Sequence, residues 1–143
     1  MSFSSNPGLA VQHYQSIKSQ TTSIPTTPHH LIQILMQGAL EKITLAKTYM
    51  QRGETEFKNT HISWAISIID GLKMSLNQKE GGQIAKNLSD LYDYMSRQLS
   101  TANQENSEEI LHEVIGLLNE IKSAWDAVPE LLQAQNTPEE ATV

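Results

Sequence analysis

The carboxylates and imidazoles of the chain offer one spacing that could hold a metal. Glu109 lies three residues before His112, and di-iron bundles carry this Glu-x-x-His pair on each of two helices, with an inward Glu on each of the others. None of the remaining histidines, His13, His29, His30 and His61, follows a Glu at that distance. Leu111 and Val114 mark the apolar side of the same segment, which turns His112 about 100° away from it. We therefore expect no metal site and predict that His112 lies on the solvent side of the helix or at the boundary of the core.

The other residues that could do chemistry form no catalytic pattern. The chain has no Cys, which excludes disulfides, thiolate metal sites, iron–sulfur clusters and thiol nucleophiles, and which suits a reducing cytoplasm. It also lacks a Gly-x-Ser-x-Gly motif, a Walker motif and a dinucleotide-binding glycine pattern. We predict a protein that is not an enzyme and that needs no cofactor.

The charge of the chain is acidic and unevenly placed. The 143 residues carry a formal net charge of −6, which argues against nucleic acid as a partner. Residues 105–143 hold nine acids and one base, a net of −8, whereas residues 1–104 hold seven acids and nine bases. The acidic block is either a solvated helix face with a tail or a surface that repels acidic partners.

Targeting signals are absent from the sequence pattern. The first residues contain no basic segment followed by an apolar run, as a secretory signal would. No stretch approaches the ~20 apolar residues of a membrane span. We expect a cytoplasmic protein without membrane insertion.

Four segments must position these side chains, because apolar residues recur in each at steps of three and four, the period of a helix face. Thr27 and Pro28 are suited to begin the first segment as N-cap and first helical residue, and Gly53 is suited to end it. The four apolar stripes are Ile32, Leu35, Ala39, Ile43, Ala46 and Met50; Ile62, Ala65, Ile66, Ile69, Leu72 and Leu76; Ile84, Leu88, Leu91, Met95, Leu99 and Ala102; and Leu111, Val114, Leu118, Ile121, Trp125 and Val128.

Polar breaks separate these segments. Residues 77–82 form a Gly-containing break between the second and third, and Asn106 followed by Glu109 resembles a capping box that begins the fourth. Pro129 is expected to end or kink the last helix. Short connections make consecutive helices antiparallel, so we predict an all-α, up-down-up-down four-helix bundle with a short N-terminal helix or arm.

The domain organisation follows from the same pattern. Residues 1–27 are rich in Ser and Thr and contain no acid, which indicates a flexible arm with one short helix over residues 9–18. Residues 28–132 form the bundle, and residues 133–143 form an acidic polar tail.

The second and third segments carry more apolar residues than a bundle core requires. Trp64 and Ile68 widen the second stripe, while Tyr92 and Tyr94 stand beside Met95 in the third. A core-facing helix needs about three apolar positions in seven. The surplus indicates either a wide core contact covered by the N-terminal arm or a groove for a partner segment.

Several segments closely resemble one known family. They are residues 28–40 (PHHLIQILMQGAL), residues 66–72 (ISIIDGL), residues 91–99 (LYDYMSRQL), Trp125, and Tyr14 three residues after Val11. In order and spacing they resemble the FliS family, the bacterial flagellar export chaperones of flagellin. The resemblance extends from about residue 11 to residue 128.

The resemblance implies a binding function. Members of the family hold the disordered C-terminal segment of flagellin in the cytoplasm, prevent its premature polymerisation, and deliver it to the cytosolic domain of the flagellar type III export gate. A homodimer is compatible with the sequence. A generic helical adaptor with another client and a metal-binding bundle enzyme are the alternatives. The residues expected to bind flagellin are Val11, Tyr14, Ile17, Trp64, Ile68, Leu72, Leu91, Tyr92 and Met95.

Overall fold

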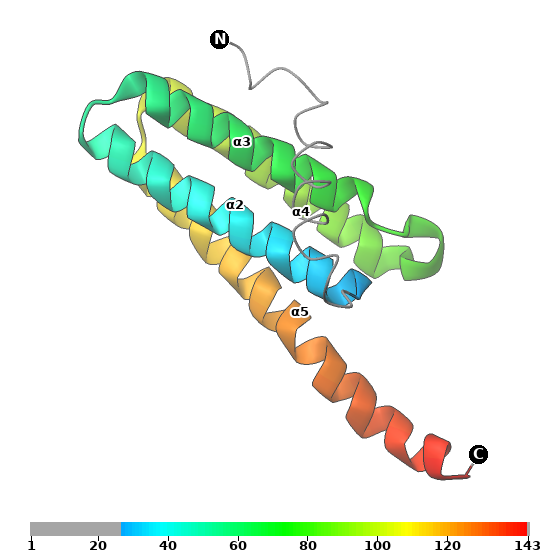
Figure 1. Cartoon of the computed structure of the whole chain (residues 1–143). Coiled ribbons are helices and arrows are strands. Elements are labelled where there is room, and N and C mark those ends of the chain that lie inside the picture. The colour runs from blue at the N-terminus through cyan, green and yellow to red at the C-terminus, as the bar shows by residue number, and fades with distance from the viewer. Residues whose placement is uncertain (1–26, 143) are drawn as a thin grey trace.

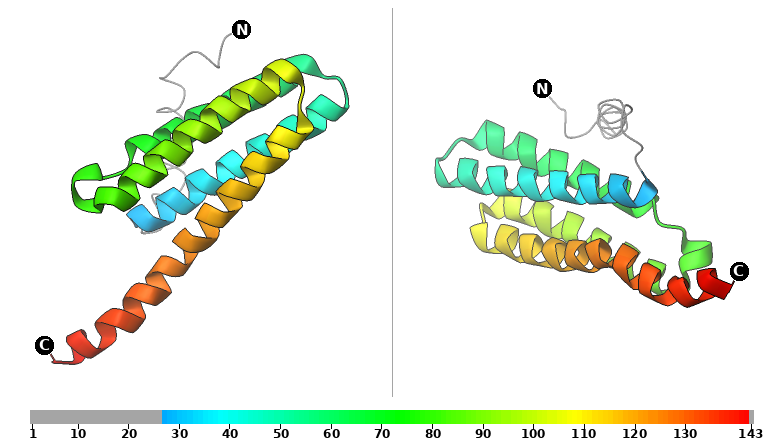
Figure 2. Two further views of the ribbon diagram at one scale, coloured as in Figure 1. Left: turned by 180° about the vertical axis from the view of Figure 1, so that it is seen from behind. Right: turned by 60° about the horizontal axis from the view of Figure 1, so that its bottom comes forward.

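The structure of the chain, a computed structural model, describes residues 27–142 (Figure 1). Within that range four helices follow one another: α2 (Pro28–Gln51), α3 (Thr55–Met74), α4 (Gln78–Glu105) and α5 (Glu108–Thr142). Helix α2 packs against α3 and α5, and α4 packs against the same two helices. Consecutive helices run in opposite directions, as the views in Figure 2 show. The predicted all-α four-helix bundle is confirmed, while the predicted N-terminal arm lies outside the described residues.

The core is the contact region of all four helices. The apolar stripes read from the sequence supply most of it. None of the four described helices is long and apolar enough to cross a membrane. The buried apolar side chains of this cluster are Leu35, Met36, Ala39, Leu40, Ile43, Ala46, Ile62, Ala65, Ile68, Ile69, Leu72, Tyr92, Met95, Leu99, Ala102, Leu111, Val114 and Leu118.

Helix α2 begins and ends where the sequence predicts. The Thr27 side chain accepts a hydrogen bond from the His30 backbone N–H at 3.1 Å, and Pro28 occupies the first turn. Two residues after the helix ends, Gly53 adopts a positive φ of 72°, a conformation that glycine reaches without steric penalty. The short turn that follows returns the chain as α3.

The polar break between α3 and α4 is divided into a short turn and a kink. The Asn77 side chain accepts from the Glu80 backbone N–H and begins α4. Gly82 then interrupts the helix with φ 52° and ψ −128°. An L side chain is strained at that φ, and a Cβ on the preceding Gly81 would lie only 2.6 Å from Ala85 Cβ, so both glycines fit this backbone better than other residues.

The predicted capping box of α5 is wrong. Asn106 closes α4 in the left-handed conformation, with φ 51°. The Ser107 hydroxyl accepts from the Ile110 backbone N–H at 3.2 Å. Because Asn tolerates left-handed φ better than other non-glycine residues, it ends one helix and leaves the capping of the next to Ser107.

Helix α5 does not end at Pro129. It continues to Thr142 and extends past the end of the bundle (Figure 1). It thus includes residues 133–142, for which the sequence pattern indicated a polar tail. Proline's fixed φ is compatible with a helix, but the residue removes one backbone donor and its ring crowds the carbonyl four residues earlier.

Candidate functional site

The outer seam between α2 and α3 brings facing residues together in a regular order. A Cβ added to Gly38 would lie 3.7 Å from Ile68 Cδ1. Four residues along α2, the Lys42 ammonium lies 3.8 Å from the centre of the Trp64 ring. Near the far end, the Tyr49 ring stacks on Phe57 at 5.3 Å. From one pair to the next, the residue number rises on α2 and falls by the same amount on α3. The seam between these antiparallel helices therefore has one continuous register.

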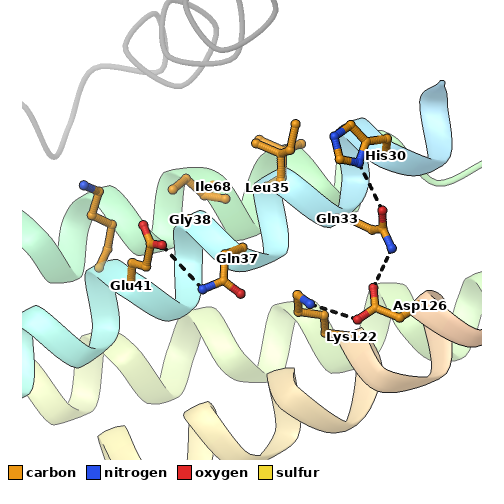
Figure 3. A pocket seen from close by; sticks show the side chains of 11 residues that line it. His30, Gln33, Leu35, Gln37, Gly38, Glu41, Ile68, Lys122 and Asp126 are labelled. Carbon is orange, nitrogen blue, oxygen red and sulfur yellow. Dashed lines mark hydrogen bonds and ion pairs between the residues drawn. The ribbon is translucent and has the colours of Figure 1, made fainter. Parts of the chain in front are cut away.

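A groove of about 530 Å³ begins at one end of this seam and extends across α2 to α5 (Figure 3). Its apolar floor is made by Ile34, Leu35, Gly38 and Ile68. Gly38 keeps the floor low because it has no side chain, and an added Cβ would make an ordinary contact rather than a clash. The groove can therefore accept an apolar side chain from a partner.

Polar residues line the side of the groove that α5 supplies. Gln33 Nε2 donates to Asp126 Oδ1 at 2.7 Å, and Lys122 Nζ donates to Asp126 Oδ2 at 2.8 Å. The Lys122 ammonium and then the Gln33 amide hold the pKa of the Asp126 carboxyl below its ordinary value. His30 extends this series of hydrogen bonds through a 3.2 Å contact between its Nδ1 and Gln33 Oε1 (Figure 3). The rim is thus an ordered set of donors and acceptors beside an apolar floor.

Aromatic side chains continue the seam beyond the groove. The His61 ring lies 4.9 Å from Tyr49 and 6.1 Å from Trp64, which connects the rings into one row. Phe57 is 56% exposed and Leu45 is 40% exposed. We call Tyr49, Phe57, His61 and Trp64 the aromatic row. Exposed apolar surface that adjoins a groove is typical of an interaction site.

The helices that carry the groove also match a known family along most of their length. A family model described as "Flagellar protein FliS" matches residues 10–131. The chain belongs to the FliS family.

Curated relatives agree with this assignment. The chain is 38% identical over 120 residues to the flagellar secretion chaperone FliS of Vibrio cholerae, covering 84% of this chain and 88% of the relative. It is 41% identical over 119 residues to FliSB of Pseudomonas aeruginosa, covering 83% and 94%, and 40% identical over 119 residues to FliS of Salmonella typhimurium, covering 82% and 88%. Because these relatives are secretion chaperones, the prediction that the chain is not an enzyme is confirmed.

The FliS-family chain places its predicted binding residues in two environments. Ile68 is 4% exposed but lines the groove, and Trp64 is half-buried in the aromatic row. Leu72, Tyr92 and Met95 are buried in the core, and burial raises the pKa of Tyr92 to about 12. Leu91 is half-buried and packs on the core. The other predicted residues, Val11, Tyr14 and Ile17, lie outside the described residues.

Sequence reasoning missed the groove residues of α2 and α5. Gly38 carries the clearest signal, since a glycine inside a helix is unfavourable by about 1 kcal/mol relative to alanine and calls for a reason. Asp126 and Lys122 gave no signal in the sequence. Their role depends on a contact with Gln33, which lies on another helix and 93 positions from Asp126 in the sequence.

His112 was the candidate metal ligand in the sequence, and no metal site was predicted there. His112 is exposed, as predicted. Within residues 27–142, no three His, Asp or Glu side chains gather as metal ligands.

Proposed function

We propose that this FliS-family protein binds the disordered C-terminal segment of flagellin in the cytoplasm. Bound in this way, the segment is kept from premature polymerisation until it is delivered to the cytosolic domain of the flagellar export gate. The observation that carries the proposal is the groove over Gly38 and Ile68, which opens beside the aromatic row. The names of the relatives support the same class of function.

The physical character of the seam favours a client that lacks structure of its own. The groove and the aromatic row run along two rigid helices and offer apolar contacts over several helical turns. A disordered segment that folds onto such a surface buries on the order of 1,000–3,000 Å² and loses several kcal/mol to its own ordering. That ordering moderates the affinity, which suits a chaperone that must release its client.

The predicted binding residues take different parts in the proposed complex. Trp64 and Ile68 contact the client directly at the seam, and Leu91 offers a further half-buried apolar contact. The buried set of Leu72, Tyr92 and Met95 supports the bundle beneath these positions. Val11, Tyr14 and Ile17 keep their predicted role as an apolar face of the N-terminal segment that contacts the client.

Filling the groove tests the proposal. Gly38→Ala should bind as the unmodified chain does, because its Cβ would make an ordinary 3.7 Å contact with Ile68. Gly38→Leu should fill the floor and displace one client side chain. Losing roughly 50–100 Å² of apolar contact amounts to about 1–2 kcal/mol, or about tenfold in affinity.

Calorimetry with a flagellin C-terminal peptide provides the measurement. Gly116→Leu is the matched control, since Gly116 is an exposed helical glycine whose added Cβ would meet nothing within 4 Å. The control should leave the affinity unchanged. Equal affinities for Gly38→Leu and the unmodified chain would remove the groove from the client site, and a failure of the unmodified chain to bind the peptide would refute the function itself.

A further inference from the structure

His29 and Trp125 form a two-way contact between the first turn of α2 and the end of the packed part of α5. Their rings stack with centroids 4.6 Å apart and planes 14° from parallel. His29 Nε2 donates to the Trp125 backbone carbonyl at 2.7 Å, and Trp125 Nε1 donates to the His29 backbone carbonyl at 3.0 Å. We call this pair the His29–Trp125 clasp. The first of these bonds requires the proton on Nε2, because a carbonyl can only accept.

The Trp125 carbonyl needs an outside donor because of a residue four positions later. In an α-helix the carbonyl of one residue accepts from the N–H four residues on. For Trp125 that residue is Pro129, which has no N–H. Helix α5 nevertheless continues through this position to Thr142. The His29 imidazole thus occupies the place of the donor that proline lacks.

The clasp adjoins the polar rim of the groove. Asp126, the next residue of α5, receives the hydrogen bond from Gln33, which lies one helical turn after His29 on α2. Lys122 and Asp126 line the groove from α5, and His30 lines it from α2. The positions of Lys122 and Asp126 beside the groove therefore depend on how firmly Trp125 is held against the start of α2.

We propose that His29 is a positioning residue of the groove. Its imidazole donates to the carbonyl that the missing Pro129 amide would have bonded, and so holds α5 against the start of α2. Lys122 and Asp126 thereby keep their positions beside the groove although α5 contains a proline. A carbonyl already paired within its own helix would keep that partner if an outside donor were lost, whereas the Trp125 carbonyl would lose the donor that stands in for the Pro129 amide. The proline leaves the Trp125 carbonyl without its helical donor, and the His29 donor joins α5 to α2 at this carbonyl.

A double-mutant cycle tests the link between His29 and Pro129 without any client. His29→Phe keeps a stacking ring but removes the donor, and it should raise the unfolding equilibrium constant about tenfold, the effect of one lost hydrogen bond. Pro129→Ala restores an N–H for the Trp125 carbonyl. In that background, His29→Phe should raise the constant by less than about threefold. Equal effects in both backgrounds would overturn the link.

Client affinity tests the positioning role, which rests on the function proposed above. Measured with a flagellin C-terminal peptide under conditions where every variant is fully folded, His29→Phe should weaken binding at least threefold. His29→Gln should recover most of the loss, because its amide can donate from nearly the same place as Nε2. His112→Phe, an exposed substitution on α5, is the control and should bind normally.

The stability cycle tests the link between His29 and Pro129, and the peptide affinity tests the positioning role of His29. Unchanged peptide affinity in folded His29→Phe, with normal binding by the unmodified chain, would overturn the positioning role. If the unmodified chain does not bind the peptide, the proposed function fails, while the stability cycle still decides whether His29 replaces the Pro129 amide.

Discussion

Replacing Lys58 by Met should destabilise the bundle, although the substitution removes a buried charge. Lys58 is only 4% exposed. Its ammonium donates to the Asn103 backbone carbonyl at 3.1 Å and to Asn106 Oδ1 at 2.6 Å, so it joins α3 to the end of α4. Met keeps the length of the apolar stem and removes both bonds, which isolates the contribution of the ammonium.

Opposing terms decide the size of this effect. Hydrogen bonds to a charged donor contribute about 1.5–3 kcal/mol each, and a cation at a helix C-terminus adds about 0.3–1 kcal/mol. Burying the ammonium opposes them by several kcal/mol. Asn106 is exposed and can bond to water after the substitution, whereas the Asn103 carbonyl, in a half-buried residue, is less free to do so. The expected net loss is roughly 1–2 kcal/mol.

Urea unfolding followed by helical circular dichroism measures this loss. Lys86→Met is the matched control, because Lys86 is exposed on α4 and its replacement should change the free energy of unfolding by less than about 0.5 kcal/mol. A Lys58→Met protein as stable as the unmodified chain would show that desolvation cancels the two bonds, and the reasoning would be wrong.

Three further predictions concern the kink, the core and the aromatic row. Gly82→Ala should lower the free energy of unfolding by about 1–3 kcal/mol, because alanine is strained at φ 52° and ψ −128°; a gain in urea midpoint would contradict this. Stability should fall as pH rises from 10 to 12, because the unfolded Tyr92 hydroxyl ionises near 10 while the folded one keeps its proton to about 12. Tyr92→Phe should flatten that fall in pH-dependent urea midpoints, and an unchanged slope would assign it to other groups. Phe57→Ser, at a side chain 56% exposed, should shift the urea midpoint little but weaken flagellin-peptide binding in calorimetry, and the reverse pattern would make Phe57 a structural residue.

The fold was predictable because its signals are local. Helical spacing of apolar residues marked the stripes that became the core, and the capping residues Thr27 and Gly53 marked the ends of α2. The prediction at Asn106 was wrong because two residue types suited to capping stand side by side. Sequence alone does not decide which of Asn106 and Ser107 ends α4 and which begins α5.

The candidate site was less predictable because its parts meet only across helices. Trp64 and Ile68 were found as surplus apolar residues, but the groove beside them depends on Gly38, which faces Ile68 only in the observed register. The contact between His29 and the Trp125 carbonyl is likewise non-local, since it joins residues 96 positions apart on two helices. Patterns within one segment do not carry that information.

The single register of the α2–α3 seam has an evolutionary consequence. Gly38 faces Ile68, Lys42 faces Trp64, and Tyr49 faces Phe57. A substitution on one helix therefore changes the space available to one particular position on the other. Homologous chains should show paired replacements at these positions, with a larger residue at 38 accompanied by a smaller one at 68, and an aromatic residue lost at 64 accompanied by loss of the cation at 42. Independent variation at these pairs would contradict the expectation that facing positions limit each other.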